Sequence, residues 1–171
     1  MRKLVTVAIG ATLTLLSAAV FAQTQVKVAV IDVGKVANES KEGKKIQSNL
    51  KDYHDKKQGE ITAKEADLKA LEDKSKDPKL SDDKRDEVRN QFTAKMYEYQ
   101  AYAKASQDEM EGRSQKMQND FQQKLQGVIA KYAQAKGISI VVEKGITLFN
   151  ADSLEITADV IAEMNKAYPG V

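Results

Sequence analysis

The chain has 171 residues, with 27 Lys and Arg, 25 Asp and Glu, and no cysteine. The absence of cysteine excludes a disulfide framework and thiol or iron–sulfur chemistry. A nearly neutral balance of charge argues against a general nucleic-acid binder, which needs an excess of basic residues.

A basic start, Met1-Arg2-Lys3, is followed by an apolar run over residues 4–20 that ends in small side chains and returns to polar sequence. This order is typical of a secretory signal peptide, and it predicts that residues 1–22 are cleaved off after Ala22 on export. The alternative is an uncleaved membrane anchor, because the run nearly reaches the length that spans a bilayer. Without this segment the basic and acidic residues are equal in number.

The first structural element is expected at residues 26–32, VKVAVID. These residues alternate at first and then become almost wholly apolar, with β-branched side chains throughout, so we predict a strand that is buried on at least one face. Residues 33–36 would then turn the chain.

A charged run rich in Ala and Gln covers residues 41–136 and contains one proline, Pro78. Its hydrophobic residues recur mostly in steps of three and four, which is the period of a long amphipathic helix or coiled coil. We predict helices over residues 41–75 and 82–135, paired as an antiparallel hairpin. Gly59 is either a tolerated surface glycine or a hinge that lets the first helix bend, and the sequence leaves both open.

The turn of this hairpin is predicted at residues 76–81. Pro78 disfavours helical geometry at Asp77 and cannot continue the preceding helix. Ser81, followed by two aspartates, predicts the N-cap of the second helix. Because the second helix is the longer one, it should extend beyond the end of the first helix from about residue 115, and residues 116–135 should pack against something else.

The residues after Gly137, a predicted helix C-cap, favour β structure. Residues 138–143 and 146–149 are rich in β-branched and apolar side chains, and Lys144-Gly145 lies between them. We predict a β-hairpin formed by a second and a third strand.

A closing amphipathic helix is expected at residues 156–164, with Thr157 as its N-cap. The arm then comprises residues 41–115, and residues 23–40 with 116–171 form a body that joins subunits. The predicted core of this body consists of Val28, Val30, Ile31, Ile138, Ile140, Val142, Leu148, Ile156 and Val160.

The fold class is therefore predicted as α+β, with a small β-rich body and a long helical hairpin inserted between strand one and strands two and three. Burial of about 25 cal/mol per Å² must balance roughly 1–2 kcal/mol of backbone entropy per ordered residue. The charged run offers little apolar surface, so we expect an oligomer in which the strands of several subunits cover one another's edges.

The two ends of the chain resemble the OmpH-like Skp family of periplasmic chaperones. The resemblance is carried by residues 138–142, ISIVV, by Phe149-Asn150 and by residues 155–160, EITADV, and the strand at residues 28–32 is similar to the first strand of that family. It implies a homotrimer whose strands form one barrel between subunits, with three hairpins around a cavity. It also implies a periplasmic holdase that keeps unfolded outer-membrane proteins from aggregating without ATP.

Family members are described as having basic arms that match acidic clients and lipopolysaccharide. Residues 41–130 of this chain instead contain 19 basic and 18 acidic residues. A peripheral contact with the membrane or with lipopolysaccharide therefore stays open.

Tyr97, Tyr102 and Met110 are the candidate client-binding residues. Tyr97 lies about 200° around the helix from Tyr99 and cannot share its face, so we hypothesise that it points into the cavity with any exposed part of Tyr102 and Met110. Tyrosine and methionine adapt to varied apolar partners. Packing between the two arm helices is the alternative for this group of residues.

No catalytic site is expected, and neither is a metal or cofactor. The sole histidine, His54, lies in a charged helix, and the carboxylates are interleaved with lysines in the manner of solvated helix pairs. Two other classes remain as alternatives: a structural coiled-coil tether of the envelope, and an enzyme whose site forms between subunits.

Overall fold

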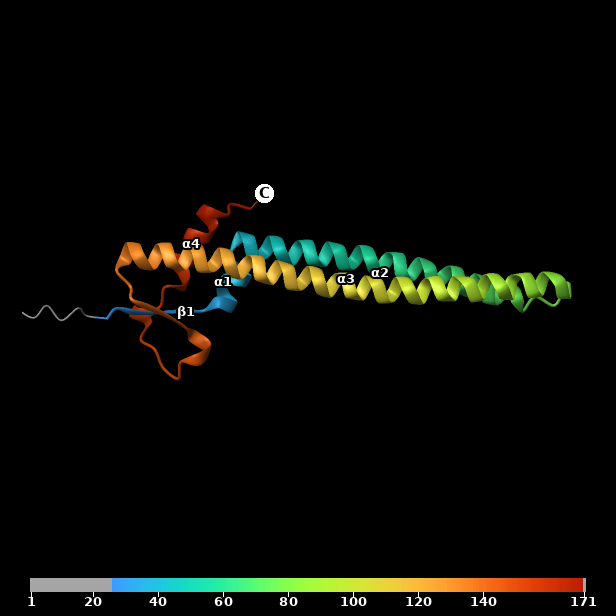
Figure 1. Cartoon of the computed structure of the whole chain (residues 1–171), viewed down its shortest axis with the longest axis horizontal. Helices are drawn as coiled ribbons and strands as arrows, with labels where there is room; N and C mark the ends of the chain where they lie inside the picture. Colours follow the sequence, from blue (N-terminus) through green and yellow to red (C-terminus); the bar gives the residue numbers. More distant parts are fainter. Residues whose placement is uncertain (1–25, 171) are drawn as a thin grey trace, which may run out of the picture.

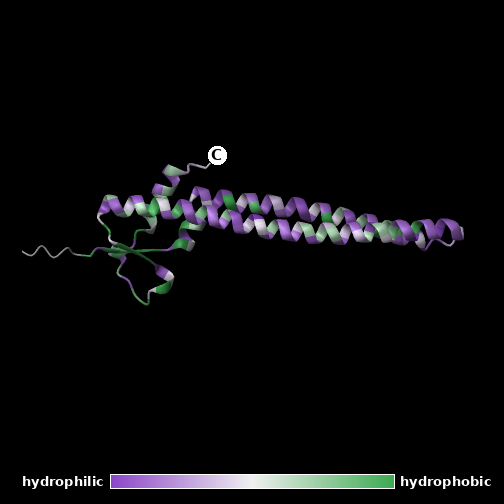
Figure 2. Cartoon of the chain, in the orientation of Figure 1, coloured by the Kyte–Doolittle hydropathy of each residue, from purple (hydrophilic) through white to green (hydrophobic). Residues whose placement is uncertain are grey.

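A long helical hairpin projects from a small base in the computed structural model, which describes residues 26–170 (Figure 1). The predicted signal peptide, residues 1–22, lies outside this part of the chain. The elements are, in order, β1 (Val28–Ile31), α1 (Val33–Glu39), α2 (Lys41–Ser75), α3 (Asp82–Lys136), β2 (Ile140–Glu143), the 3₁₀ turns η1 (Lys144–Ile146) and η2 (Asp152–Leu154), and α4 (Thr157–Ala167). Figure 2 shows a mostly hydrophilic arm and a hydrophobic β1.

Helix α2 has the predicted bounds, and its start is fixed from two sides. The backbone N–H of Gly43 donates to the Ser40 hydroxyl at 3.1 Å, and the N–H of Lys41 donates to Asn165 Oδ1 of α4 at 2.7 Å. Both bonds satisfy donors that a helix start leaves without an intrahelical partner. A Cβ added at Gly43 would lie 1.8 Å from the carbonyl oxygen of Ala37, so only glycine lets α1 and α2 approach this closely.

Helix α3 begins after Ser81 and ends at Gly137, as predicted. Ser81 occupies the N-cap position without a side-chain cap bond, while Asp82 and Asp83 place negative charge in the first turn, where the helix dipole favours it. Gly137 has φ 64°, a left-handed geometry that glycine adopts without strain and that stops the helix.

The arm tip lies between Ser75 and Asp82, around Pro78, as predicted. The N–H of Lys79 donates to Asp77 Oδ1 at 2.8 Å, which is a local turn bond of the kind aspartate favours. This bond helps to hold the reversal of the chain at the tip.

The two arm helices remain paired down to the base. Lys124 of α3 forms an ion pair with Glu42 in the first turn of α2. The pairing of α3 with α2 thus continues beyond residue 115, where a hairpin folded back at Pro78 would end it. The reason is that residues paired across the arm, such as Tyr102 and Glu60, lie at equal distances in sequence from a point after Pro78 rather than from Pro78 itself.

The base is organised around one apolar cluster, and it is more helical than the β-rich body predicted. The cluster joins β1, α1, the last part of α3 and α4, and it contains Ala29, Ile31, Val36, Phe121, Leu125, Val128, Ile156, Val160 and Met164. Helices therefore supply most of the core, and the described residues contain a sheet of two strands.

The two strands are parallel, with Val28 opposite Ile140 and Ile31 opposite Glu143. Parallel neighbours need a long crossover connection, and here the whole arm provides it. Glu155 makes an isolated bridge to Val30 on β1.

The third strand predicted at residues 146–149, and with it the β-hairpin, is wrong for this chain. Lys144–Ile146 form η1, and the following residues are irregular. The Thr147 hydroxyl donates to the carbonyl oxygen of Lys144 at 2.8 Å. Such local bonds compete with strand pairing and favour turns. This competition explains why residues 146–149 form no strand although their side chains have high β propensity.

Thr157 is not the N-cap of the closing helix, because that position belongs to Ile156. The Thr157 hydroxyl instead accepts a hydrogen bond from the backbone N–H of Asp32 at 2.9 Å. It ties the end of β1 to α4, which gives this buried polar side chain a structural partner.

Candidate functional site

Tyrosines connect α2 to α3 along the middle of the arm. Each phenol donates across the hairpin to a carboxylate, and the pairs are Tyr53 with Glu109, Tyr99 with Glu65 at 2.7 Å, and Tyr102 with Glu60. These hydrogen bonds are the main cause that raises the pKa of the Tyr53 and Tyr99 phenols. Polar bonds thus replace part of the apolar seam that a coiled coil normally has.

Cations lie over the same aromatic rings. The Lys57 ammonium is 5.6 Å from the ring centre of Tyr53 and 4.9 Å from that of Tyr102, and it pairs with Glu109 at 3.0 Å. Arg113 stands 4.2 Å from the Tyr53 ring centre. The Tyr53 hydrogen bond, followed by Lys57, holds the pKa of Glu109 below its ordinary range.

A cleft of about 720 Å³ opens between α2 and α3 beside this network. Leu50, Ile61 and Met110 contribute apolar surface to it, and Tyr53 is also among its lining residues. Its size lies within the range of roughly 300–1,000 Å³ that is usual for ligand pockets. Two further clefts along the arm are smaller, at about 490 and 430 Å³.

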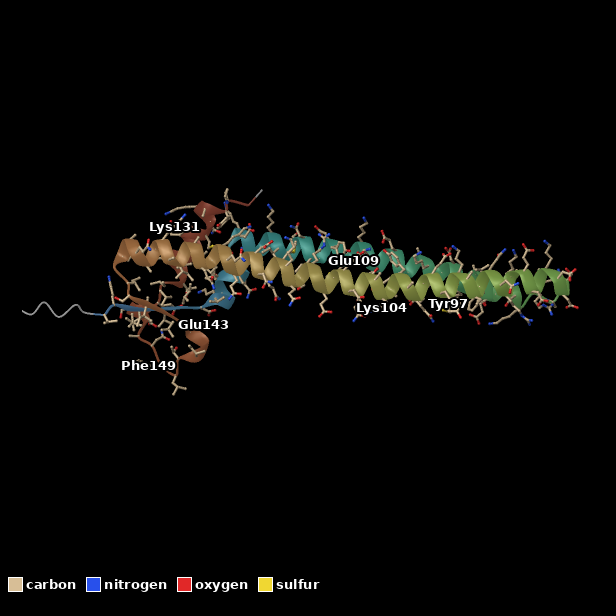
Figure 3. The ribbon with its side chains drawn as sticks, in the orientation of Figure 1. Tyr97, Lys104, Glu109, Lys131, Glu143 and Phe149 are labelled. Carbon is tan, nitrogen blue, oxygen red and sulfur yellow. The ribbon has the colours of Figure 1, made fainter. Side chains whose placement is uncertain are left out.

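The three predicted client-binding residues do not form one surface. Tyr97 is 69% exposed and lies on the outer side of α3, whereas Glu109 lies toward α2 (Figure 3). Tyr102 is half-buried in the tyrosine network, and Met110 is half-buried and lines the cleft. Tyr102 and Met110 therefore lie at the interface between the arm helices, while the cavity position of Tyr97 stays a prediction.

Tyr53, Ala103 and Ser106 line the cleft but are not among the predicted client-binding residues. Ala103 and Ser106 lie three residues apart on α3 and both line the cleft. A pair of small residues at helical spacing where the hydrophobic seam should continue is the signal that could have located it.

The predicted body residues divide by exposure in the single chain. Val30, Ile31, Ile156 and Val160 are buried, Val28, Ile138 and Val142 are half-buried, and Ile140 and Leu148 are exposed. Beside Leu148, Phe149 is 87% exposed and points away from the base in Figure 3. Ile146, Leu148 and Phe149, which we call the apolar loop, are thus large hydrophobic side chains exposed next to each other.

His54 and Gly59 both lie on the exposed surface of α2. His54 is exposed and its Nδ1 lies 3.5 Å from Asp55, and a Cβ at Gly59 would meet no atom within 4 Å. Among residues 26–170 there is no group of three or more His, Cys, Asp or Glu side chains placed to hold a metal ion. The same residues include no helix with the length and hydropathy needed to cross a bilayer.

The fold is that of a protein with a charged α-helical hairpin that projects from a small α/β base. Comparison with known families identifies the family. A family model described as outer membrane protein (OmpH-like) matches residues 27–164. The chain belongs to this OmpH-like family.

A solved structure has the same fold. It is a Caulobacter crescentus CB15 protein assigned as an OmpH-like outer membrane chaperone, with 22% sequence identity and a TM-score of 0.74. The similarity covers 84% of this chain and 86% of the other. A comparison with curated proteins gave no match.

Proposed function

We propose that this protein is an ATP-independent holdase of the periplasm, which binds unfolded outer-membrane proteins and prevents their aggregation. Membership of the OmpH-like family supports the proposal, as does a fold shared with a protein assigned as an outer membrane chaperone. The sequence of residues 1–22, which has the order of a signal peptide, supports export.

The observation that carries the proposal is the composition of the arm surface. Ion pairs follow one another along both helices, for example Lys51 with Asp55 and Lys104 with Asp108, and Tyr97 stands exposed among them. Isolated apolar contacts on a charged arm bind weakly one by one, and several arms acting together can retain a chain. A single large apolar patch would instead make the chaperone itself prone to aggregate.

We further propose a homotrimer, in which the strands of three copies join as a barrel and the arms enclose a cavity. The apolar loop supports assembly, because large side chains exposed together usually mark an interface. The sheet also supports it, because among residues 26–170 β2 pairs with β1 alone, which leaves the second edge of β2 for a strand of another copy.

A light-scattering assay tests the holdase. A urea-unfolded outer-membrane β-barrel protein is diluted into buffer with a stoichiometric amount of the mature chain, and we expect scattering to be suppressed. A photoreactive residue at position 97 should form adducts with the same client. Unsuppressed aggregation would favour a structural tether, while adducts elsewhere on the arm and none at 97 would exclude Tyr97 from the binding surface.

A further inference from the structure

The cleft between α2 and α3 has a lining that differs from the rest of the arm. Its lining residues include four glutamines, Gln58, Gln107, Gln115 and Gln118. Its ionisable residues are Tyr53, His54, Lys57 and Glu111, and Lys57 already pairs with Glu109. On an arm that otherwise alternates charges, this site is close to neutral and rich in amides.

The apolar part of the cleft favours an aromatic ring. Met110 offers a thioether, which makes favourable contacts with aromatic rings. Tyr53 offers a ring for stacking, and its hydrogen bond to Glu109 fixes its hydroxyl end. The Lys57 ammonium, which already lies over two rings, can interact with a third.

Polar contacts in the cleft come from its glutamine amides, which are exposed. Ser106 also lines the cleft, but it is 4% exposed and its hydroxyl oxygen is itself buried, so an entering peptide does not reach that oxygen. The glutamines carry both donors and acceptors, so they complement the neutral backbone on either side of an inserted ring.

We infer that this cleft captures single aromatic side chains of an extended, uncharged polypeptide, with glutamine amides binding the backbone beside the ring. The inference rests on the proposed holdase function for the identity of that polypeptide. Strands of outer-membrane barrels alternate apolar and polar residues and carry aromatic residues near both ends. An unfolded strand of this kind offers a ring with small polar neighbours, which matches the neutral cleft.

The first experiment fills the cleft. A dye-labelled peptide that alternates Phe or Tyr with Ser and Thr is titrated into the mature protein, and fluorescence anisotropy reports binding. Ser106→Phe should weaken binding about tenfold, the loss expected for one well-packed aromatic contact. Ala105→Phe adds the same ring at the neighbouring exposed position outside the cleft lining, and it should leave binding unchanged.

The second experiment does not alter the packing of the hairpin. A photoreactive residue replaces Gln107 at the cleft or Lys104 on the outer side of α3 (Figure 3). We expect adducts at the aromatic residues of the peptide from position 107 and few from position 104. Adducts from 104 alone, or undiminished binding by a folded Ser106→Phe variant, would overturn the inference.

The outcomes also separate this inference from the function on which it rests. Wild-type protein that binds the peptide at the cleft but does not suppress aggregation would refute the holdase and leave the cleft as a peptide site. Equal suppression of aggregation and equal peptide binding by wild type and Ser106→Phe would refute the cleft and leave the holdase. A lower oligomer mass for Ser106→Phe would assign the cleft to a second copy of this chain and overturn the inference.

Discussion

The Tyr132–Asp159 hydrogen bond adds a polar contact between α3 and the closing helix α4, which also pack together through apolar side chains. The Tyr132 hydroxyl donates to Asp159 of α4, and this bond is the main cause that raises the pKa of Tyr132 from 10.0 to about 12. The neutral phenol is thus the form that the fold stabilises. Its contribution is complete below pH 10.0 and is lost as the pH rises through about 12.

Tyr132→Phe should therefore lower the free energy of unfolding by about 1 kcal/mol at neutral pH, allowing for solvent screening at this exposed bond. The difference from wild type should shrink as the pH rises above 10.0. Urea denaturation of both proteins at neutral pH and above pH 10.0 measures this difference in the free energy of unfolding. A constant difference across this range would show that the lost contact is packing rather than the hydrogen bond.

Among the elements, α2 contains two glycines in contrasting surroundings. Gly43→Ala should destabilise the protein by about 2–3 kcal/mol, because its Cβ would overlap the backbone of α1. Gly59→Ala, which meets nothing, should stabilise α2 by about 0.5–1 kcal/mol through its higher helix propensity. Thermal denaturation followed by circular dichroism at 222 nm compares the two variants.

Gly59→Ala also tests the predicted hinge. If Gly59 is a tolerated surface glycine and not a hinge, the stabilised variant should bind clients as the wild type does. A loss of client binding in a variant with a higher melting temperature would support a bending role.

The arm should lose stability in acid. The pKa values of Glu72, Glu87 and Glu98 are lowered below 4.5 chiefly by the neighbouring Lys76, Lys84 and Lys95, and that of Glu109 chiefly by Tyr53. A lowered folded-state pKa contributes stability above the unfolded value and loses it as the pH falls through the folded value. Melting temperatures should be level near neutral pH and fall below pH 4.5. A flat profile into acid would show that these pairs contribute nothing.

The elements that the sequence predicted best are those fixed by local signals. Helical periodicity, Pro78 and Gly137 act within a few residues, so α2 and α3 appear at the expected positions. Residues 146–149 have strand composition, yet no strand within residues 26–170 pairs with them. Pairing partners are a property of tertiary structure, which propensity alone does not report. The cleft was missed for the same reason, since it depends on which residues of α2 face Ala103 and Ser106.

For the whole molecule, the apolar loop gives the sharpest test of assembly. Replacing Leu148 and Phe149 together by Asp should reduce the solution mass to that of a single chain, because charges would then be buried at the proposed interface. The helical circular dichroism should persist, since both side chains are exposed in the single chain. Light scattering coupled to size exclusion measures the mass, and Tyr97→Asp on the arm is the control. An unchanged mass would place the interface elsewhere.

The parallel pairing of β1 with β2 also sets the order in which the chain can fold. Val28 can pair with Ile140 only after all the residues of the intervening arm have been synthesised. The hydrogen bond from the Lys41 N–H at the start of α2 likewise requires Asn165, which is near the C-terminus. Each arm helix forms from hydrogen bonds between residues close in sequence, whereas closing the base joins distant segments, which is slow. We therefore expect the arm helices to form before the base closes, so that an oligomer joined through the base could assemble only after the C-terminal residues have folded.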